Sequence, residues 1–136
     1  MSETNQGCHK LLAITRQLRG EGGCPWDKEQ TIASMVHYLK SEHDELVAAI
    51  ACGDSANICE ELGDIMFVLL LIAQIAEEEN LFSVDDVFVG IVEKLHRRHP
   101  HVFAQRRDMT MEELDEQWRR IKAREKAAAA KTRSGN

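Results

Sequence analysis

The segment from Ile65 to Ala73 reads IMFVLLLIA, nine apolar residues in succession. A helix that spans a membrane needs about 20 such residues, and the acidic residues Asp64 and Glu77 flank this run closely. The run therefore predicts a core helix that is apolar nearly all round. Such a helix needs neighbours on every side, and one short chain supplies few of them. We therefore expect a second copy of the protein to complete the core, in a homodimer or a dimer of dimers.

Helical periodicity elsewhere in the chain predicts an all-α fold, a bundle of four to five helices. A first helix is expected to end near the glycine-rich stretch RGEGGCPWD. Thr31 can cap a second helix, which should end at Gly53 because glycine is a good C-terminal stop. Asp54 or Ser55 then caps the third helix, which carries the apolar run.

Two further helices are predicted from capping residues in the second half of the chain. Ser83 followed by Asp86 opens a fourth helix, which must end before Pro100. Thr110 with Glu113 forms a capping-box signature for a fifth. The sequence shows no strand-like alternation.

Length and composition set the scale of this bundle. At 136 residues, with 43% hydrophobic and 29% charged residues, the chain should form one domain over residues 1–126, with a modest core. Residues 127–136 are expected to form a frayed tail. The N-terminal residues MSETNQGCHK lack the basic segment and apolar run of a secretory signal, which predicts a cytoplasmic protein that does not bind membranes.

The cysteines agree with a reducing compartment. They are Cys8, Cys24, Cys52 and Cys59, and no two of them have the CxxC spacing. We expect free thiols. A zinc site formed by Cys8, Cys24, His99 and His101 is an alternative that lacks the ligand-pair spacing of such sites. Histidines beside a proline at a helix exit are more often structural, so His99 and His101 are left out of the predicted site.

Charge is segregated along the chain, which has a net charge of -6. The stretch from Ser41 to Asp64 is acidic and contains no Lys or Arg, whereas the stretch from Gln117 to Asn136 is basic and contains one Glu. This pattern suits a site that holds cations beside an anionic ligand, although solvated helix faces would produce it too.

Two acidic pairs have a spacing that can form a metal site. Glu42 and Glu45 are three residues apart, as are Glu61 and Asp64, so each pair lies on one side of its helix. Two antiparallel helices can bring the pairs together. The four carboxylates would then repel one another unless a cation lay among them, and oxygen ligands favour Mg²⁺ or Mn²⁺. The alternative is two solvated acidic faces.

Three separated motifs resemble the MazG family of nucleoside triphosphate pyrophosphohydrolases. They are GGCPWDKEQT at 22–31, ELGD at 61–64 and EKLHRRHPHVF at 93–103. The resemblance implies protomers that pair into helical bundles, and Mg²⁺-dependent cleavage between the α and β phosphates to yield a nucleoside monophosphate and pyrophosphate. In the family's EExxE and ExxD signature, Glu42, Glu45, Glu61 and Asp64 match, but the first glutamate is Ser41. That departure puts in doubt what the extra carboxylate does, such as activating the attacking water.

Five residues of the second half are candidate substrate ligands. Lys94, Arg97 and Arg98 can hold a departing pyrophosphate, or they can merely complement the dipole at the end of their helix. Trp118 and Lys122 lie four residues apart on one helix face, and the resemblance implies that such a pair contacts the nucleotide by stacking and by charge. The alternative is a core tryptophan beside a surface lysine.

The resulting functional hypothesis is Mg²⁺-dependent hydrolysis of nucleoside triphosphates, non-standard ones among the candidates. Because Ser41 replaces a signature glutamate, the alternative is a catalytically weakened nucleotide-binding sensor or an adaptor dimer. The basic fifth helix also raises nucleic-acid binding. The isoelectric point of about 5.5 opposes that option, so no nucleic-acid partner is predicted.

Overall fold

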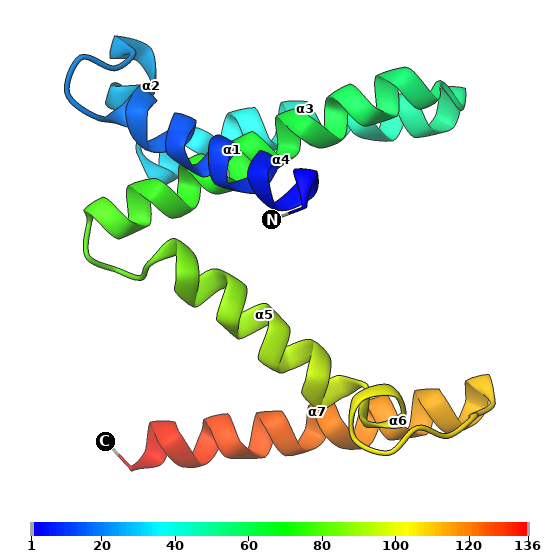
Figure 1. The fold of residues 1–136 in the computed structure, drawn as a ribbon. Helices are drawn as coiled ribbons and strands as arrows, with labels where there is room; N and C mark the ends of the chain where they lie inside the picture. The colour runs from blue at the N-terminus through cyan, green and yellow to red at the C-terminus, as the bar shows by residue number, and fades with distance from the viewer. Residues whose placement is uncertain (1, 136) are drawn as a thin grey trace. The chain divides into compact units, whose positions relative to one another are not determined.

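The computed structural model describes residues 2–135, which form helices and no strand. The helices are α1 (Glu3–Arg19), α2 (Pro25–Glu29), α3 (Ile32–Cys52), α4 (Ser55–Glu78), α5 (Val84–Arg98), α6 (Pro100–Phe103) and α7 (Met111–Ser134) (Figure 1). The predicted all-α fold class is thus confirmed. The chain divides into two compact units, one ending at Val87 and the other beginning at Phe88.

The boundaries of α3 and α4 follow from their capping residues. The Thr31 side chain accepts from the Ser34 amide and the Ser34 hydroxyl accepts from the Thr31 amide, which closes the start of α3. Gly53 ends α3 with a φ of 69°, a left-handed conformation that favours glycine. The Asp54 carboxylate then accepts two amides at the start of α4. The predicted limits of α3 and the predicted start of α4 are thus confirmed.

The two later predicted helices also begin where expected. Ser83 and Asp86 bond to each other reciprocally at the start of α5, and Thr110 with Glu113 forms a capping box at the start of α7. The structure adds two short helices, α2 and α6, which were not predicted. Each begins with a proline, whose fixed φ and missing N–H suit the first helical position.

The last helix is longer than the sequence analysis expected. Residues 127–134 continue α7, and the Gly135 amide donates to the Lys131 carbonyl at its end. The expected tail starts with four alanines, the residue with the highest helix propensity, and nothing in it breaks the helix before Gly135. Intrinsic helix propensity therefore extends α7, although residues 127–135 are all exposed and add nothing to the core.

The core of the first unit lies between α3 and α4. These helices are antiparallel and pack along each other, and α1 packs against α4 (Figure 1). Met35 of α3 and Val68, Leu71 and Ile75 of α4 form the buried cluster. Helix α4 therefore supplies three of the four buried residues, and two of these, Val68 and Leu71, belong to the apolar run.

Another part of the apolar run is exposed in the single chain. Leu62, Met66 and Leu69 recur at helical spacing on α4, and Leu69 is 50% exposed. In the single chain, one apolar face of α4 therefore lies in the core and another lies in solvent, so the expected cover by a second copy stays a prediction. Among the described residues, no helix combines the length and the apolar character that a membrane span requires.

The glycine-rich motif after α1 has a structural role. The largely buried Arg19 guanidinium donates to the carbonyls of Asp27, at 2.7 Å, and Gln30, at 2.9 Å, and pairs with the Glu78 carboxylate at the end of α4. A Cβ on Gly23 would lie 2.2 Å from the Leu18 carbonyl oxygen, so this close turn requires glycine. The motif thereby links the segment before α3 to the end of α4.

Candidate functional site

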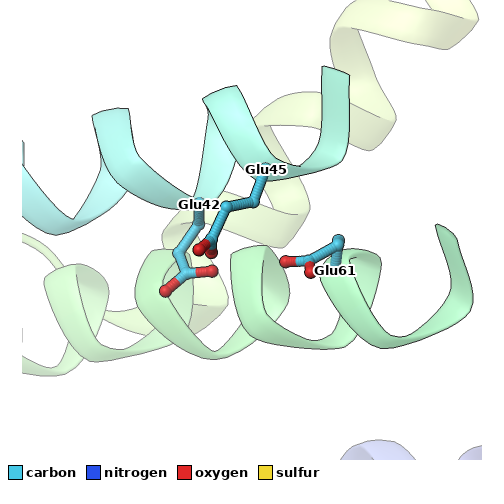
Figure 2. Close-up of side chains that lie close together, drawn as sticks. All are labelled: Glu42, Glu45 and Glu61. Atoms are coloured by element: carbon cyan, nitrogen blue, oxygen red, sulfur yellow. The ribbon is translucent and has the colours of Figure 1, made fainter. Parts of the chain in front are cut away.

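Three glutamates from two helices meet in the first unit. Glu42 and Glu45 extend from α3 and Glu61 extends from α4, with their carboxylates directed toward one another (Figure 2). One carboxylate oxygen from each lies within 4.8 Å of the others. The three-residue spacing puts Glu42 and Glu45 on one side of α3, and antiparallel packing brings α4 opposite them.

Two oxygens of this cluster are buried without a partner. Oε2 of Glu42 and Oε2 of Glu61 are shielded from solvent, and neither accepts a hydrogen bond from any described residue. Burying an ionised carboxylate without a partner is unfavourable, so such groups are normally paired or coordinate a metal. A set of carboxylate oxygens suits a hard divalent cation such as Mg²⁺ or Mn²⁺. The residues present therefore fit the predicted ion.

Burial and mutual repulsion raise the pKa of two glutamates in the cluster. Burial raises the pKa of Glu42 above its usual value, and contact with Glu45 and the charges of Asp64 and Glu61 raise it further. Burial also raises the pKa of Glu61, with added repulsion from Glu45 and Asp64. A cation between the carboxylates would reverse this repulsion.

The fourth predicted ligand, Asp64, lies close to the cluster but outside the set within 4.8 Å. Its charge acts on both Glu42 and Glu61, whereas the group of three contains no atom of Asp64. A different acid on α3, Asp44, is held by Lys40 at 2.9 Å and His43 at 3.2 Å on the exposed surface. Asp44 therefore does not take part in the cluster.

The second unit contains a cavity of about 470 Å³ between the end of α5 and the start of α7. Its lining includes three of the predicted substrate ligands, Lys94, Arg98 and Trp118. His99 and His101, which the sequence analysis set aside, also line it. The His99 Nδ1 lies 2.7 Å from the Leu95 carbonyl oxygen, and the Gln117 amide nitrogen lies 3.0 Å from the His101 Nδ1.

The predicted pair on α7 is in direct contact. The Lys122 ammonium lies 4.9 Å from the centroid of the Trp118 ring, which is a cation–π arrangement. Trp118 is 49% exposed, so it is not a core residue in the single chain. An exposed indole has a face that can stack on a flat ligand.

Arg97 and Arg98 are both engaged by Glu125 of α7. The Arg97 Nε lies 2.7 Å from Glu125 Oε1, and the Arg98 Nη2 lies 3.0 Å from Oε2. The two guanidinium groups lower the pKa of Glu125 to about 2. Glu125 was not among the predicted site residues, although it is the one acidic residue of the basic C-terminal stretch.

The candidate zinc ligands receive no support as a metal group. All four cysteines are free, as predicted. Among the described residues, the group able to hold a metal is the glutamate cluster.

Comparison with known proteins identifies relatives for most of the chain. Residues 30–103 match the model of the MazG nucleotide pyrophosphohydrolase domain. A nucleoside triphosphate pyrophosphohydrolase of Escherichia coli K12 is 43% identical over 122 residues, which cover 89% of this chain and 46% of that protein. A nucleoside triphosphate pyrophosphohydrolase/pyrophosphatase MazG of Thermotoga maritima is 38% identical over 135 residues, which cover 99% of this chain and 51% of that protein. The chain thus spans about half the length of these two relatives.

The fold has a solved counterpart. The crystal structure of a mazG-related protein from Thermotoga maritima matches with a TM-score of 0.73 and 32% identity. The match covers 85% of this chain and 98% of that one.

Proposed function

Because the chain belongs to the MazG nucleotide pyrophosphohydrolase family, we propose that it hydrolyses nucleoside triphosphates to a nucleoside monophosphate and pyrophosphate. The observation that carries this proposal is the glutamate cluster with its two buried, unpartnered oxygens. Glu42, Glu45 and Glu61 would hold Mg²⁺ or Mn²⁺, and Asp64 would add charge and a further ligand.

The carboxylates have a clear task in such a reaction. A bound divalent cation neutralises phosphate oxygens and lowers the pKa of a coordinated water. Glu42, Glu45 and Glu61 would hold this ion between α3 and α4, two helices that pack along each other. Ser41, exposed on α3 next to Glu42, can orient a water by hydrogen bonding but cannot serve as a general base near neutral pH. If the absent glutamate assists the attacking water in the family, turnover by this chain should be slow.

The nucleotide would be bound by residues of the second unit. Lys94 and Arg98 supply positive charge in the cavity that Trp118 also lines. We assign the phosphates to the cations and the base to the indole, with Lys122 beside the ring. Arg97 would add charge from outside this cavity.

We further propose a homodimer or a dimer of dimers. The exposed apolar stripe of Leu62, Met66 and Leu69 supports this assembly, because burying it against a second copy would remove apolar surface from water. Free thiols at all four cysteines support a reducing compartment, which we take to be the cytoplasm.

Ser41 favours a second candidate function. With a serine where the family signature has a glutamate, the protein would bind a nucleotide with little or no turnover and act as a sensor or an adaptor dimer. Binding without hydrolysis distinguishes this candidate from the enzyme.

The deciding experiment measures pyrophosphate release from a panel of standard and non-standard ribo- and deoxyribonucleoside triphosphates, with and without Mg²⁺. We expect Mg²⁺-dependent release from at least one substrate, and its loss in Glu61→Gln. Nucleotide binding by calorimetry without any release would favour the sensor. If the protein neither binds a nucleotide nor releases pyrophosphate, both proposed functions are contradicted.

A further inference from the structure

We propose that Glu125 is a positioning residue that holds the Arg98 guanidinium at the wall of the cavity in the second unit, ready to bind a phosphate group. This inference rests on the proposed function, because it assigns Arg98 to the triphosphate. It adds a residue that the sequence motifs do not contain.

The geometry of the Arg98 contact leaves part of its guanidinium available. Glu125 accepts from Nε of Arg98 at 3.4 Å and from Nη2 at 3.0 Å, which occupies one edge of the planar group. No acceptor for Nη1 of Arg98 is found among residues 2–135. The same arginine lines the cavity together with Lys94 and Trp118. One edge is therefore anchored to α7, and a second edge can receive an anion.

The neighbouring Arg97 contributes to the anchor but not to the cavity. Its Nε lies 2.7 Å from Oε1 of Glu125, and its side chain is 51% exposed, against 21% for Arg98. It lines a separate hollow with Arg124 instead. Two guanidinium groups share one carboxylate, so the three side chains keep one net positive charge, and their field still attracts a phosphate.

The contacts of Glu125 with Arg97 and Arg98 are better suited to orienting the arginines than to stabilising the fold. Salt bridges near a protein surface contribute little to folding, and a free arginine side chain samples many rotamers. A contact that fixes one rotamer removes this freedom before the ligand arrives, which favours binding. With its pKa lowered to about 2, Glu125 stays charged at every physiological pH. The anchor is therefore permanent and not a pH switch.

The test compares Glu125→Gln and Glu125→Asp with the wild type in the pyrophosphate-release assay on its best substrate. We expect Glu125→Gln to raise KM about tenfold, the effect of losing one charge-assisted hydrogen bond, with kcat within about twofold because the contact orients binding. Glu125→Asp keeps the charge and should therefore raise KM less than Glu125→Gln does. Glu116→Gln, at an exposed glutamate on the same helix, is the matched control and should leave KM unchanged.

A double-variant cycle shows whether Glu125 acts through Arg98. In an Arg98→Ala background, Glu125→Gln should change KM by less than about twofold. An equal tenfold effect in both backgrounds would overturn the positioning role, as would an unchanged KM in the single variant. A lower KM in Glu125→Gln would also overturn it, because the carboxylate would then compete with the phosphate.

Failure of the proposed function is separable from failure of this inference. If the wild type releases no pyrophosphate, the enzymatic proposal fails, and the same variants are then compared by calorimetry with inorganic tripolyphosphate as the probe. A tenfold weaker tripolyphosphate affinity in Glu125→Gln would support the positioning role. Equal affinity, or no binding by the wild type, would reject it. Circular dichroism and melting temperature confirm that each variant is folded.

Discussion

A carboxylate oxygen of Glu42 on α3 lies within 4.8 Å of one of Glu61 on α4, and in both residues Oε2 is buried without a hydrogen-bond partner among the described residues. Two like charges at such a distance repel by roughly 1 to 4 kcal/mol, depending on the local dielectric. Burial and repulsion both raise the pKa of each group. The fold therefore holds an arrangement that is unfavourable by itself and favourable around a cation.

The first prediction concerns the metal. Millimolar Mg²⁺ or Mn²⁺ should raise the melting temperature of the wild type by several degrees, because an ion that binds the native state alone stabilises it. Glu61→Gln should remove most of this rise. Asp44→Asn removes an equal charge from the Lys40 contact on the exposed surface of α3. This control variant should keep the Mg²⁺-induced rise in melting temperature. Melting curves that do not differ between Mg²⁺ and EDTA would contradict the site.

The metal effect should depend on pH. The pKa values of Glu42 and Glu61 are raised in the folded state, so the native protein binds these protons more tightly than the unfolded chain does. Without metal, this contribution makes the protein more stable as pH falls through the raised values. Protons and Mg²⁺ compete for the same oxygens. The Mg²⁺-induced rise in melting temperature should be larger at about pH 8 than at about pH 5, and a pH-independent rise would argue for binding elsewhere.

Assembly should depend on the exposed face of α4. Light scattering at micromolar concentration should report a dimer or a tetramer. Leu69→Asp should dissociate it while the single-chain core stays folded, because Leu69 is 50% exposed in one chain and the charge would be buried only in the assembly. Leu71→Ala is the contrasting change. Leu71 is fully buried in the core, and its truncation should cost about 2–5 kcal/mol of stability. A monomeric wild type would refute the proposed dimer.

The second unit should divide nucleotide recognition between charge and stacking. Lys94→Ala should weaken a nucleoside triphosphate far more than the matching monophosphate, since the ammonium group is assigned to the outer phosphates. Trp118→Ala should weaken both by a similar factor, since both contain the base, and stacking contributes about 1–3 kcal/mol. Calorimetry with both ligands provides the comparison. Identical patterns in the two variants would contradict the assignment.

Restoring the missing glutamate should speed the reaction. Ser41 precedes Glu42 on α3, and its exposed side chain stands where the family signature has a carboxylate. If that carboxylate assists the attacking water, Ser41→Glu should increase kcat on at least one triphosphate with little change in KM, the pattern of an interaction gained in the transition state. Ser41→Gln, which adds similar bulk without a base, should not. An unchanged rate in a folded, Mg²⁺-binding Ser41→Glu variant would show that this carboxylate does not limit turnover.

Local interactions made much of the fold predictable. The caps at Thr31, Asp54 and Thr110 involve bonds between residues two or three positions apart, so neighbouring side chains specify them without reference to the rest of the chain. The short helix α6 was missed because its signal is limited to Pro100 before one turn of chain. The extension of α7 to Ser134 was not predicted, although the four alanines at 127–130 have high helix propensity.

By itself, the sequence determined which carboxylates can share a side of a helix, because Glu42 and Glu45 lie one turn apart on any α-helix. The tertiary structure alone decided that Glu61 completes the group within 4.8 Å and that Asp64 is not part of it, since this depends on the rotation of α4 against α3 and on side-chain rotamers. It also decided that Glu125 binds Arg97 and Arg98, 28 and 27 residues away. Spacing along a helix cannot specify such contacts, because they form only when separate helices pack.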